Sequence, residues 1–255
     1  MSLIKIKDIG LTYHSIKTET VAIENINLEI EKGEFVSIIG PSGCGKSTLL
    51  NIISGLLEPS KGEVIMLNEN FENRLEKMGY MFQKDYLFEW LSVWNNVKLG
   101  LKIRKMDTKE NIEIVSNLLE NYGLIKFKNH KPGELSGGMR QRVALIRTLA
   151  LNPEVLLLDE PFSALDYQTR LKVCDDVKEI IQREGKTAIM VTHDLGEAIS
   201  TSDRIIMLTK RPAIVKLDVD INFKNKEATP FNRRKEPEFN EYFKFLWKEL
   251  DMINE

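Results

Sequence analysis

Short apolar runs alternate with longer helical patterns along most of the chain. The apolar runs predict strands at residues 3–9, 21–30, 35–39, 63–67, 78–82, 154–159, 187–192 and 204–208. Helical spacing follows Lys46, Ser136, Gln168 and Asp194. A mixed β start followed by alternating strands and helices is typical of an α/β fold built around a parallel sheet.

The strand signals disappear between residues 83 and 150. The stretches SVWNNVKLGL (92–101) and TKENIEIVSNLLENYGL (108–124) carry the apolar spacing of amphipathic helices instead. Close to residue 255, one helical face would hold Phe239, Tyr242, Phe243, Leu246 and Leu250. We expect this last helix to pack on the core and not on a membrane, because the stretch is not strongly basic.

The segment IIGPSGCGKSTLL (38–50) connects a predicted strand to a predicted helix. Its glycines let the backbone turn N–H groups toward an anion, and the helix presents its positive end. Gly40-x-x-x-x-Gly45-Lys46-Ser47 matches the P-loop pattern, in which Lys46 would reach the β- and γ-phosphates and Ser47 would ligate Mg²⁺. The candidate nucleotide-binding residues are Gly40, Ser42, Gly43, Cys44, Gly45, Lys46, Ser47 and Thr48. The alternative is a glycine-rich turn without a ligand.

A second chemical signal is EVLLLDEPFSALD (154–166), an apolar run that ends in two carboxylates. A buried strand of this kind delivers Asp159 and Glu160 to the carboxyl end of a sheet, where α/β proteins bind ligands. Asp159 is placed to hold Mg²⁺ beside Ser47, and Glu160 is a candidate general base for a water attacking the γ-phosphate. The alternative is a solvated strand end before a turn.

Composition limits the function classes. The 36 Lys and Arg against 38 Asp and Glu, a net charge of −2, argue against a general nucleic-acid binder. The two cysteines, Cys44 and Cys174, have no metal-site spacing and no disulfide framework, which fits a reducing compartment such as the cytoplasm. No segment approaches the ~20 apolar residues of a membrane span, so any membrane role would be peripheral.

The stretch LSGGMRQR (135–142), placed between the P-loop and LLLDEP, resembles the signature motif of ATP-binding cassette (ABC) ATPases, the motor subunits of ABC transporters. Further motifs follow the order of that family. The resemblance implies that Tyr13 stacks on adenine and that Gln83 links Mg²⁺ and the attacking water to the helical segment. It also implies that SALD (163–166) faces a partner subunit and that His193 contacts the γ-phosphate.

Ser136, Gly137 and Gly138 would begin a helix, so their N–H groups and the serine hydroxyl could form a second anion cradle. The resemblance implies that this cradle serves the ATP held by a second copy of the chain, so that a homodimer encloses two nucleotides. The alternative is an ordinary serine N-cap.

The resemblance covers about residues 3–210 and implies an α/β fold with a P-loop NTPase core around a parallel sheet. It also implies an antiparallel β subdomain at the N-terminal side and an inserted helical subdomain. We expect one ABC ATPase domain over 1–255, with the core at 1–83 and 151–211, the helical insertion at 84–150 and a C-terminal tail at 212–255.

FEWLSVWNNV (88–97) and KRPAIV (210–215) resemble the ATPases of nitrate, sulfonate and taurine importers. The implied function is ATP hydrolysis with ATP and Mg²⁺, driving an integral membrane permease at the cytoplasmic face and serving a solute-binding protein indirectly. An exporter or lipoprotein-release ATPase is an alternative. So is an ABC ATPase acting on DNA, although the chain has no sustained heptad run for the long coiled coil of DNA-repair members.

The aromatic stretch QKDYLFEWLSVWNNV (83–97) follows Gln83 directly. In importers of the family the corresponding surface is a groove that receives a short helix of the membrane subunit. Phe88, Trp90 and Trp94 could instead be core residues of the helical insertion. We expect part of this set in the core and part in the groove.

Overall fold

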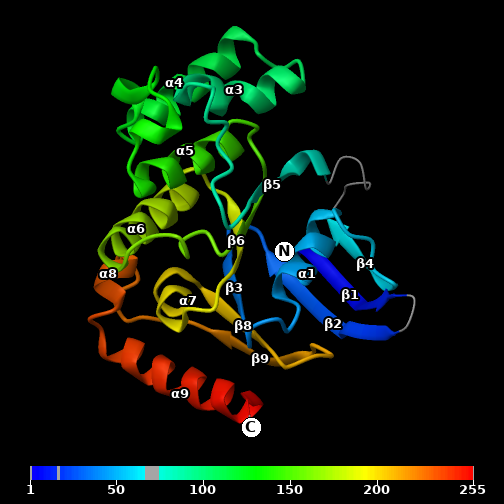
Figure 1. Cartoon of the computed structure of the whole chain (residues 1–255). Coiled ribbons are helices and arrows are strands. Elements are labelled where there is room, and N and C mark those ends of the chain that lie inside the picture. Colours follow the sequence, from blue (N-terminus) through cyan, green and yellow to red (C-terminus); the bar gives the residue numbers. More distant parts are fainter. Residues whose placement is uncertain (1, 16–17, 67–74, 255) are drawn as a thin grey trace.

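The computed structural model describes residues 2–15, 18–66 and 75–254 (Figure 1). Its strands are β1 (Ser2–His14), β2 (Glu19–Glu31), β3 (Phe35–Ile39), β4 (Lys61–Met66), β5 (Met78–Met81), β6 (Val155–Asp159), β7 (Thr187–Val191), β8 (Arg204–Leu208) and β9 (Val215–Asp220). Its α-helices are α1 (Lys46–Ser54), α3 (Val93–Ile103), α4 (Lys109–Asn121), α5 (Gly137–Leu149), α6 (Tyr167–Arg183), α7 (Leu195–Thr201), α8 (Pro230–Arg233) and α9 (Pro237–Asn254).

The larger sheet has the strand order β5-β6-β7-β3-β8-β9, and only the last pair is antiparallel. Strands β3 and β7 are buried at every residue, as expected for parallel strands covered on both faces. Because β3, β6 and β7 run in the same direction, the residues that follow them lie at one edge of the sheet. This edge receives the phosphate loop after β3, the carboxylates at the end of β6 and His193 after β7.

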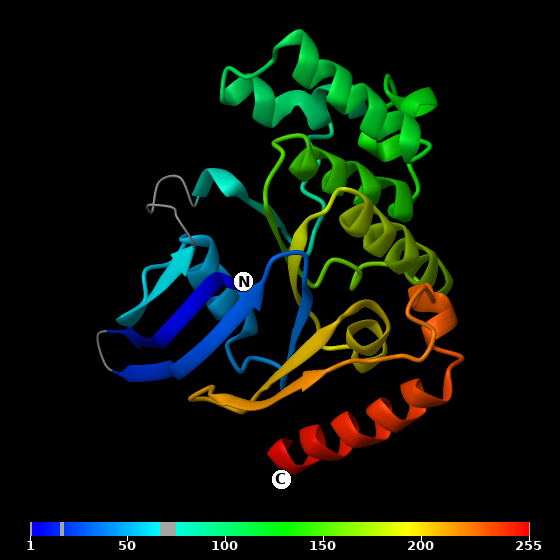
Figure 2. The same ribbon diagram turned by 180° about the vertical axis from the view of Figure 1, so that it is seen from behind.

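The smaller sheet is antiparallel, in the order β2-β1-β4, and it lies beside α1 (Figure 2). Isoleucines at alternate positions of β1 and β2, such as Ile4, Ile6 and Ile26, pack in one apolar cluster with Leu49 and Leu50 of α1. The apolar alternation that predicted these strands is therefore the pattern that attaches the small sheet to α1.

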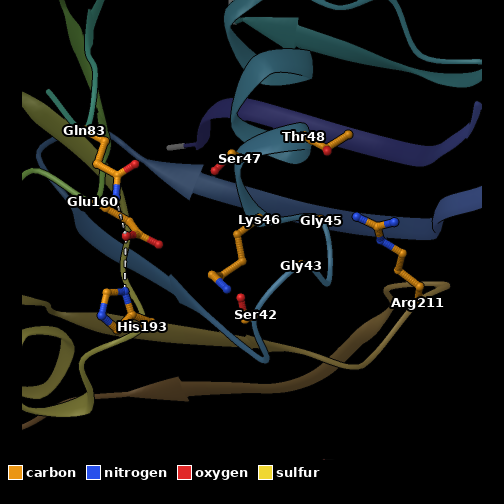
Figure 3. A pocket seen from close by; sticks show the side chains of 10 residues that line it. All are labelled: Ser42, Gly43, Gly45, Lys46, Ser47, Thr48, Gln83, Glu160, His193 and Arg211. Carbon is orange, nitrogen blue, oxygen red and sulfur yellow. Dashed lines mark hydrogen bonds and ion pairs between the residues drawn. The ribbon is translucent and has the colours of Figure 1, made fainter. Parts of the chain in front are cut away.

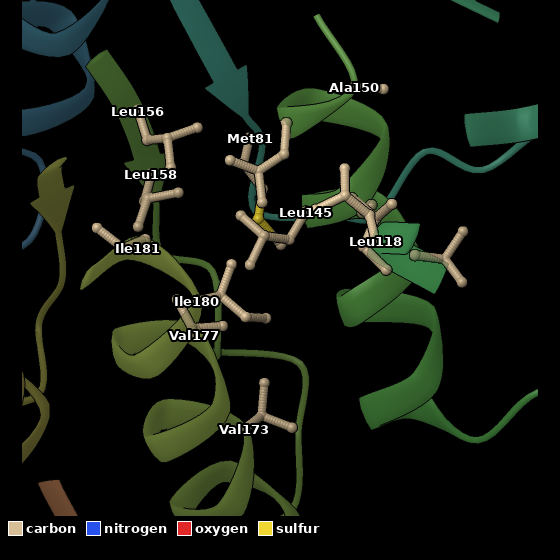
Figure 4. Packing of buried hydrophobic residues seen from close by; sticks show 14 of the residues in the cluster. Met81, Leu118, Leu145, Ala150, Leu156, Leu158, Val173, Val177, Ile180 and Ile181 are labelled. Atoms are coloured by element: carbon tan, nitrogen blue, oxygen red, sulfur yellow. The ribbon is translucent and has the colours of Figure 1, made fainter. Parts of the chain in front are cut away.

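Helices α3, α4 and α5 form the upper layer in Figure 1, and α5 packs both on α6 and on strand β5 of the large sheet. Figure 4 shows Leu156 and Leu158 of β6 directed toward Ile180 of α6 and Leu145 of α5. All four side chains are fully or almost fully buried. By the usual cost of emptying a packed site, truncating one of them to alanine should lower the free energy of unfolding by about 2–5 kcal/mol. The core therefore holds β6, which carries the two carboxylates, in a fixed position.

Helices α3 and α4 of this upper layer begin at hydroxyl N-caps. The Ser92 hydroxyl accepts a hydrogen bond from the N–H of Asn95 at 3.3 Å, and the Thr108 hydroxyl accepts one from Asn111 at the same distance. Both caps lie at the starts of the two amphipathic stretches predicted from the sequence, so local signals set where these helices begin.

The C-terminal region shows one success and one miss of the sequence analysis. Leu246 of α9 is completely buried in a cluster with residues of α7, β8 and β9, which confirms that this helix packs on the core. Strand β9, however, was not predicted. Its sequence VKLDVD alternates apolar and charged residues at an antiparallel edge, and the charges outside make the stretch resemble a polar tail. The predicted strand 63–67 is found as β4, and its last residue, Leu67, lies outside the described residues.

In the described ranges, no helix is both long enough and apolar enough to cross a membrane. The longest, α9, has 18 residues and carries charges on several turns.

Candidate functional site

One pocket of about 590 Å³ opens at the carboxyl edge of the large sheet (Figure 3). Its lining residues are Ser42, Gly43, Gly45, Lys46, Ser47, Thr48, Gln83, Glu160, His193 and Arg211. Nine of the ten were predicted site residues, and they come from four separate segments of the chain. The parallel strands bring these segments together because their carboxyl ends meet at the same edge.

The phosphate loop has a backbone that side chains would not permit. Gly40 has φ 154°, and a Cβ there would lie 2.8 Å from the carbonyl oxygen of Leu208. Gly45, the N-cap of α1, has φ 127° and no side chain to cap the helix. The first N–H groups of α1 are therefore left without a side-chain acceptor, and the positive end of the helix faces the pocket. Such an arrangement suits a bound phosphate.

Lys46 is buried at the first turn of α1. Its ammonium donates hydrogen bonds to the carbonyl oxygens of Gly40 at 2.9 Å and Pro41 at 3.0 Å. The loop therefore holds the ammonium inside itself, close to where its N–H groups converge. A bound phosphate would replace these carbonyls as the acceptor for the ammonium, because a charged acceptor makes the stronger hydrogen bond.

Ser47 and Asp159 lie together at the predicted metal position. The Ser47 hydroxyl donates to Asp159 Oδ1 at 2.9 Å, and the Tyr80 hydroxyl lies 3.3 Å from Asp159 Oδ2 and 2.9 Å from Asn51 Oδ1. Burial raises the pKa of Asp159, and the hydrogen bonds from Ser47 and Tyr80 reduce that rise. Hydroxyl and carboxylate oxygens at this separation are the donor set that Mg²⁺ prefers, so the residues fit the ion.

Glu160 lies at the centre of a polar cluster opposite Lys46. Its Oε2 accepts a hydrogen bond from Gln83 Nε2 at 3.1 Å and lies 3.2 Å from His193 Nδ1. Glu160 is also one of the few residues other than glycine with a positive φ, 45°, and its N–H bonds to the carbonyl oxygen of Val191 at 2.8 Å. Such a conformation costs about 1–3 kcal/mol and is found mainly where function requires it. Here it directs the carboxylate toward the pocket, as Figure 3 shows.

A profile of the ABC transporter family matches residues 23–163, which is more than half of the chain. The chain belongs to this family. An uncharacterized ABC transporter ATP-binding protein of Bacillus subtilis, YtlC, is 47% identical over 253 residues, 99% of this chain and 97% of that protein. The nitrate import ATP-binding protein NrtD of Synechocystis is 41% identical over 243 residues, 94% of this chain and 91% of that protein.

Solved structures agree with this assignment. A dimeric ATP-binding cassette, MJ0796, bound to ADP and phosphate is 37% identical, with a TM-score of 0.72 over 86% of this chain and 99% of that one. The structure of cbiO1 of Clostridium perfringens, part of an ABC transporter complex, matches with a TM-score of 0.77 at 26% identity, over 98% and 95% of the two chains. The predicted fold and the predicted ATPase activity are therefore confirmed, and the protein is an ABC ATPase that binds ATP.

Three predicted nucleotide residues of this ABC ATPase, Tyr13, Gly40 and Cys44, lie beside the pocket and not on its lining. Tyr13, near the end of β1, is 45% exposed, and its hydroxyl lies 3.4 Å from the Thr48 hydroxyl. An exposed ring next to the first turn of α1 is accessible to a base, and its role in stacking stays a prediction. Cys44 is buried under the loop, and burial raises the pKa of its thiol, so it acts as a small apolar filler.

The signature residues of the ABC ATPase are not part of the pocket. Ser136 caps α5, and its hydroxyl accepts a hydrogen bond from the N–H of Met139 at 3.4 Å. A Cβ on Gly138 would lie 3.0 Å from Thr169 Cγ2 and 3.1 Å from Val173 Cγ2. Within one chain, an ordinary cap and close packing on α6 account for the serine and for this glycine. The signature therefore has no place on the lining of its own chain's pocket.

Arg211 is the lining residue that sequence reasoning missed. It lies in the turn between β8 and β9, at the same sheet edge as Glu160 and His193. The signal was present, because a cationic KRP segment directly follows a buried strand. Without β9, however, nothing in the sequence indicated that the segment turns back toward the phosphate loop.

Proposed function

We propose that this ABC ATPase is the motor subunit of an importer that drives a separate membrane permease from the cytoplasmic face of the membrane. Its solute would be a small anion or organic molecule of the nitrate, sulfonate or taurine type, delivered to the permease by a solute-binding protein. Support comes from the nitrate import relatives and, above all, from the convergence of Lys46, Ser47, Gln83, Glu160 and His193 on one pocket.

The arrangement gives each side chain a separate task in hydrolysis. The open N–H groups of α1 and Lys46 bind the phosphates. Mg²⁺, when bound between Ser47 and Asp159 with Gln83 nearby, would neutralise charge on the β- and γ-phosphates. Glu160 takes the proton of the attacking water, and the amide of Gln83 holds that carboxylate in place. His193, which lies on the other side of Glu160, would contact the γ-phosphate.

A homodimer would complete the site. Because the signature lies outside the pocket of its own chain, we propose that Ser136, Gly137 and Gly138 contact the γ-phosphate bound by a partner. The dimeric state of the MJ0796 cassette supports such a pairing. ATP would then join the two chains, and hydrolysis would separate them by removing the shared group.

Light scattering on a hydrolysis-deficient variant tests this proposal. Glu160→Gln with ATP and Mg²⁺ should elute as a dimer, and with ADP as a monomer. Adding Ser136→Arg should abolish the dimer while the monomer keeps its ATP affinity, since the serine lies away from its own pocket. A double variant that still dimerises, or that loses ATP binding as a monomer, contradicts the proposal.

The permease contact is proposed at an aromatic patch formed by Phe82, Tyr86, Phe88 and Trp90. Three of these side chains are exposed, Trp90 at 71%, and Phe88 is half-buried. The neighbouring Leu87 is buried and Trp94 packs against the core, so part of the aromatic stretch belongs to the core as predicted. The groove stays a proposal. The patch begins one residue before Gln83, so a permease helix docked there would lie beside the proposed catalytic residues.

Hydrogen bonds fix the loop that carries the patch. Arg140 of α5 binds Asp85 through two bonds of 2.8 and 3.0 Å and Glu89 at 2.7 Å. Arg147 donates to the carbonyl oxygens of Asp85 and Tyr86. A rigid apolar surface with polar support is suited to receive an amphipathic helix of the permease.

Co-purification with the co-expressed permease tests the patch. Trp90→Ala should reduce recovery of the complex and leave ATP binding by the isolated chain intact. Ile103→Ala is the matched control, because Ile103 is equally exposed, at 72%, at the end of α3. Equal recovery with both variants, or loss of helix content in Trp90→Ala, contradicts docking at the patch.

A further inference from the structure

The tip of the β8–β9 hairpin brings Arg211 against the phosphate loop. Arg211 lines the main pocket and also an adjoining hollow of about 360 Å³ formed with Pro41, Ser42, Gly43, Cys44 and Lys210. A Cβ on Gly43 would lie 4.0 Å from the Nη2 atom of Arg211. Figure 3 shows the arginine directed toward Gly45, on the side of the loop away from Glu160 and His193.

Several hydrogen bonds hold this hairpin tip in place. The N–H of Thr209 donates to Ile214 O, and the N–H of Ile214 donates to the Thr209 hydroxyl, both at 3.0 Å. Ala213 exchanges two backbone hydrogen bonds of 3.0 Å with β2, through the carbonyl of Ala22 and the N–H of Glu24. Ala213 is also fully buried and lies 3.8 Å from the Cβ position of Gly45. The backbone at Arg211 therefore has little freedom to lose on binding a ligand.

The pocket lining holds two cations in different situations. The ammonium of Lys46 is bonded to two carbonyl oxygens of the loop. The guanidinium of Arg211, in contrast, makes no hydrogen bond, ion pair or ring contact with another residue in the part of the chain that the structure describes. It is exposed at the mouth of the pocket, with its donors available to an anion.

Building on the proposed nucleotide site, we propose that Arg211 is a nucleotide-binding residue that pairs with the α- and β-phosphates. P-loop N–H groups cradle these two phosphates, while the P-loop lysine reaches the β- and γ-phosphates. Arg211 lies against the cradle at Gly43 and on the side away from the hydrolytic cluster. A planar guanidinium can bind two phosphate oxygens at once, which suits it to this position. Arg211 therefore contributes to the affinity for ATP and ADP alike and not to the hydrolytic step.

Equilibrium binding of ATP, ADP and AMP to the isolated chain tests the proposal. Arg211→Ala and Arg211→Gln should each weaken the binding of ATP and of ADP by the same factor. We expect about tenfold, the usual value for a charged hydrogen-bonding pair at a partly solvated site. AMP, which keeps the α-phosphate, should also bind more weakly. The single-turnover rate at saturating ATP should stay at the wild-type value, because the contact exists in both ground and transition states.

Lys224→Ala is the matched control for a lost positive charge. Its side chain is 93% exposed, and its ammonium lies 3.9 Å from Glu238 Oε1, in a segment that does not line the pocket. This variant should bind every nucleotide as the wild type does. The melting temperature without nucleotide should not change in either Arg211 variant, since the guanidinium makes no contact that holds the fold.

Three results would overturn the role of Arg211. The first is an ADP affinity in Arg211→Gln equal to that of the wild type. The second is a loss of nucleotide affinity in Lys224→Ala as large as in the Arg211 variants. The third is a loss of ATP affinity in the Arg211 variants without a loss of ADP affinity. Lys46→Ala separates this outcome from failure of the nucleotide site. If Lys46→Ala loses ATP binding and the Arg211 variants keep it, only the inference about Arg211 is wrong. If wild-type protein binds no ATP, the proposed function is wrong as well.

Discussion

Two helices of this ABC ATPase begin at glycine-rich segments, and they begin in different ways. At α1 the N-cap is Gly45, with φ 127° and no side-chain cap, and the helix start lines the pocket. At α5 the N-cap is Ser136, with an extended backbone and a hydroxyl that caps the helix. Glycines precede α1 because of backbone geometry, whereas Gly138 of α5 makes room for Thr169 and Val173.

The difference shows what each helix start can do within one chain. The start of α1 has open N–H groups, a buried cation and the two carboxylates at the end of β6 near it, so the pocket forms within one chain. The start of α5 has already satisfied one of its N–H groups and faces no pocket of its own. Its proposed part in ATP binding therefore depends on a partner, and substitutions at the two sites should affect different measurements.

The largest expected effect is on the chemistry next to α1. Glu160→Gln should lower single-turnover ATP hydrolysis by about 10²–10⁴-fold, the usual range for loss of a positioned base, and keep ATP affinity. The amide keeps the shape of the carboxylate and its contact distance to Gln83. Rapid quench kinetics measure the rate, and hydrolysis at the wild-type rate would exclude Glu160 as the base.

In the isolated chain, ATP binding should depend on Lys46 and not on the signature residues. Lys46→Ala should weaken the binding of ATP by roughly 10–100-fold, because it removes charged hydrogen bonds to the phosphates. Ser136→Ala should leave monomer affinity unchanged. Titration calorimetry on dilute protein compares the two, and a similar loss in both would mean that the two helix starts share one site.

A reciprocal exchange of the N-caps compares the two starts directly. Gly45→Ser should lower the free energy of unfolding by about 1–3 kcal/mol, although serine is a preferred N-cap, because φ 127° is available almost only to glycine. Ser136→Gly should cost only a few tenths of a kcal/mol, because its backbone is in an ordinary region. Urea unfolding measures both, and equal costs would remove the conformational distinction.

The smallest expected effect is on stability and concerns the ion pair between Arg140 of α5 and Asp85 in the loop after Gln83. Burial raises the pKa of Asp85, but the hydrogen bonds from Arg140 and from the N–H of Leu87 outweigh it and leave the pKa below its ordinary value. The stabilisation is therefore present above the ordinary Asp pKa of about 4 and is lost as the pH falls through the lowered value.

Asp85→Asn should accordingly be less stable than the wild type at pH 7, and the difference should shrink toward pH 3. Urea midpoints at several pH values provide the comparison. A difference that does not change with pH would mean that the charge of Asp85 contributes nothing to the link.

Local sequence determined much of this molecule. The P-loop spacing, the apolar strand β6 with its two carboxylates, and the hydroxyls at Ser92, Thr108 and Ser136 each act over a few residues, so their patterns could be read directly. The same patterns placed seven of the ten pocket-lining residues among the candidates, and the family resemblance added Gln83 and His193. The strand pattern was weaker where charged residues alternate with apolar ones on an exposed edge strand, and for that reason β9 was missed.

Only the tertiary structure decided which distant groups meet. The bond from Ser47 to Asp159 joins residues 112 positions apart, and that from Gln83 to Glu160 joins residues 77 positions apart. Both depend on the order of parallel strands, which no local pattern encodes. Arg211 reaches the phosphate loop because β9 folds back along β8 and Ala213 bonds to β2. The exclusion of Ser136 from the pocket has the same origin, since the start of α5 packs on α6, where Gly138 lies against Thr169 and Val173. Side-chain chemistry is local, whereas the meeting of side chains depends on how the core packs.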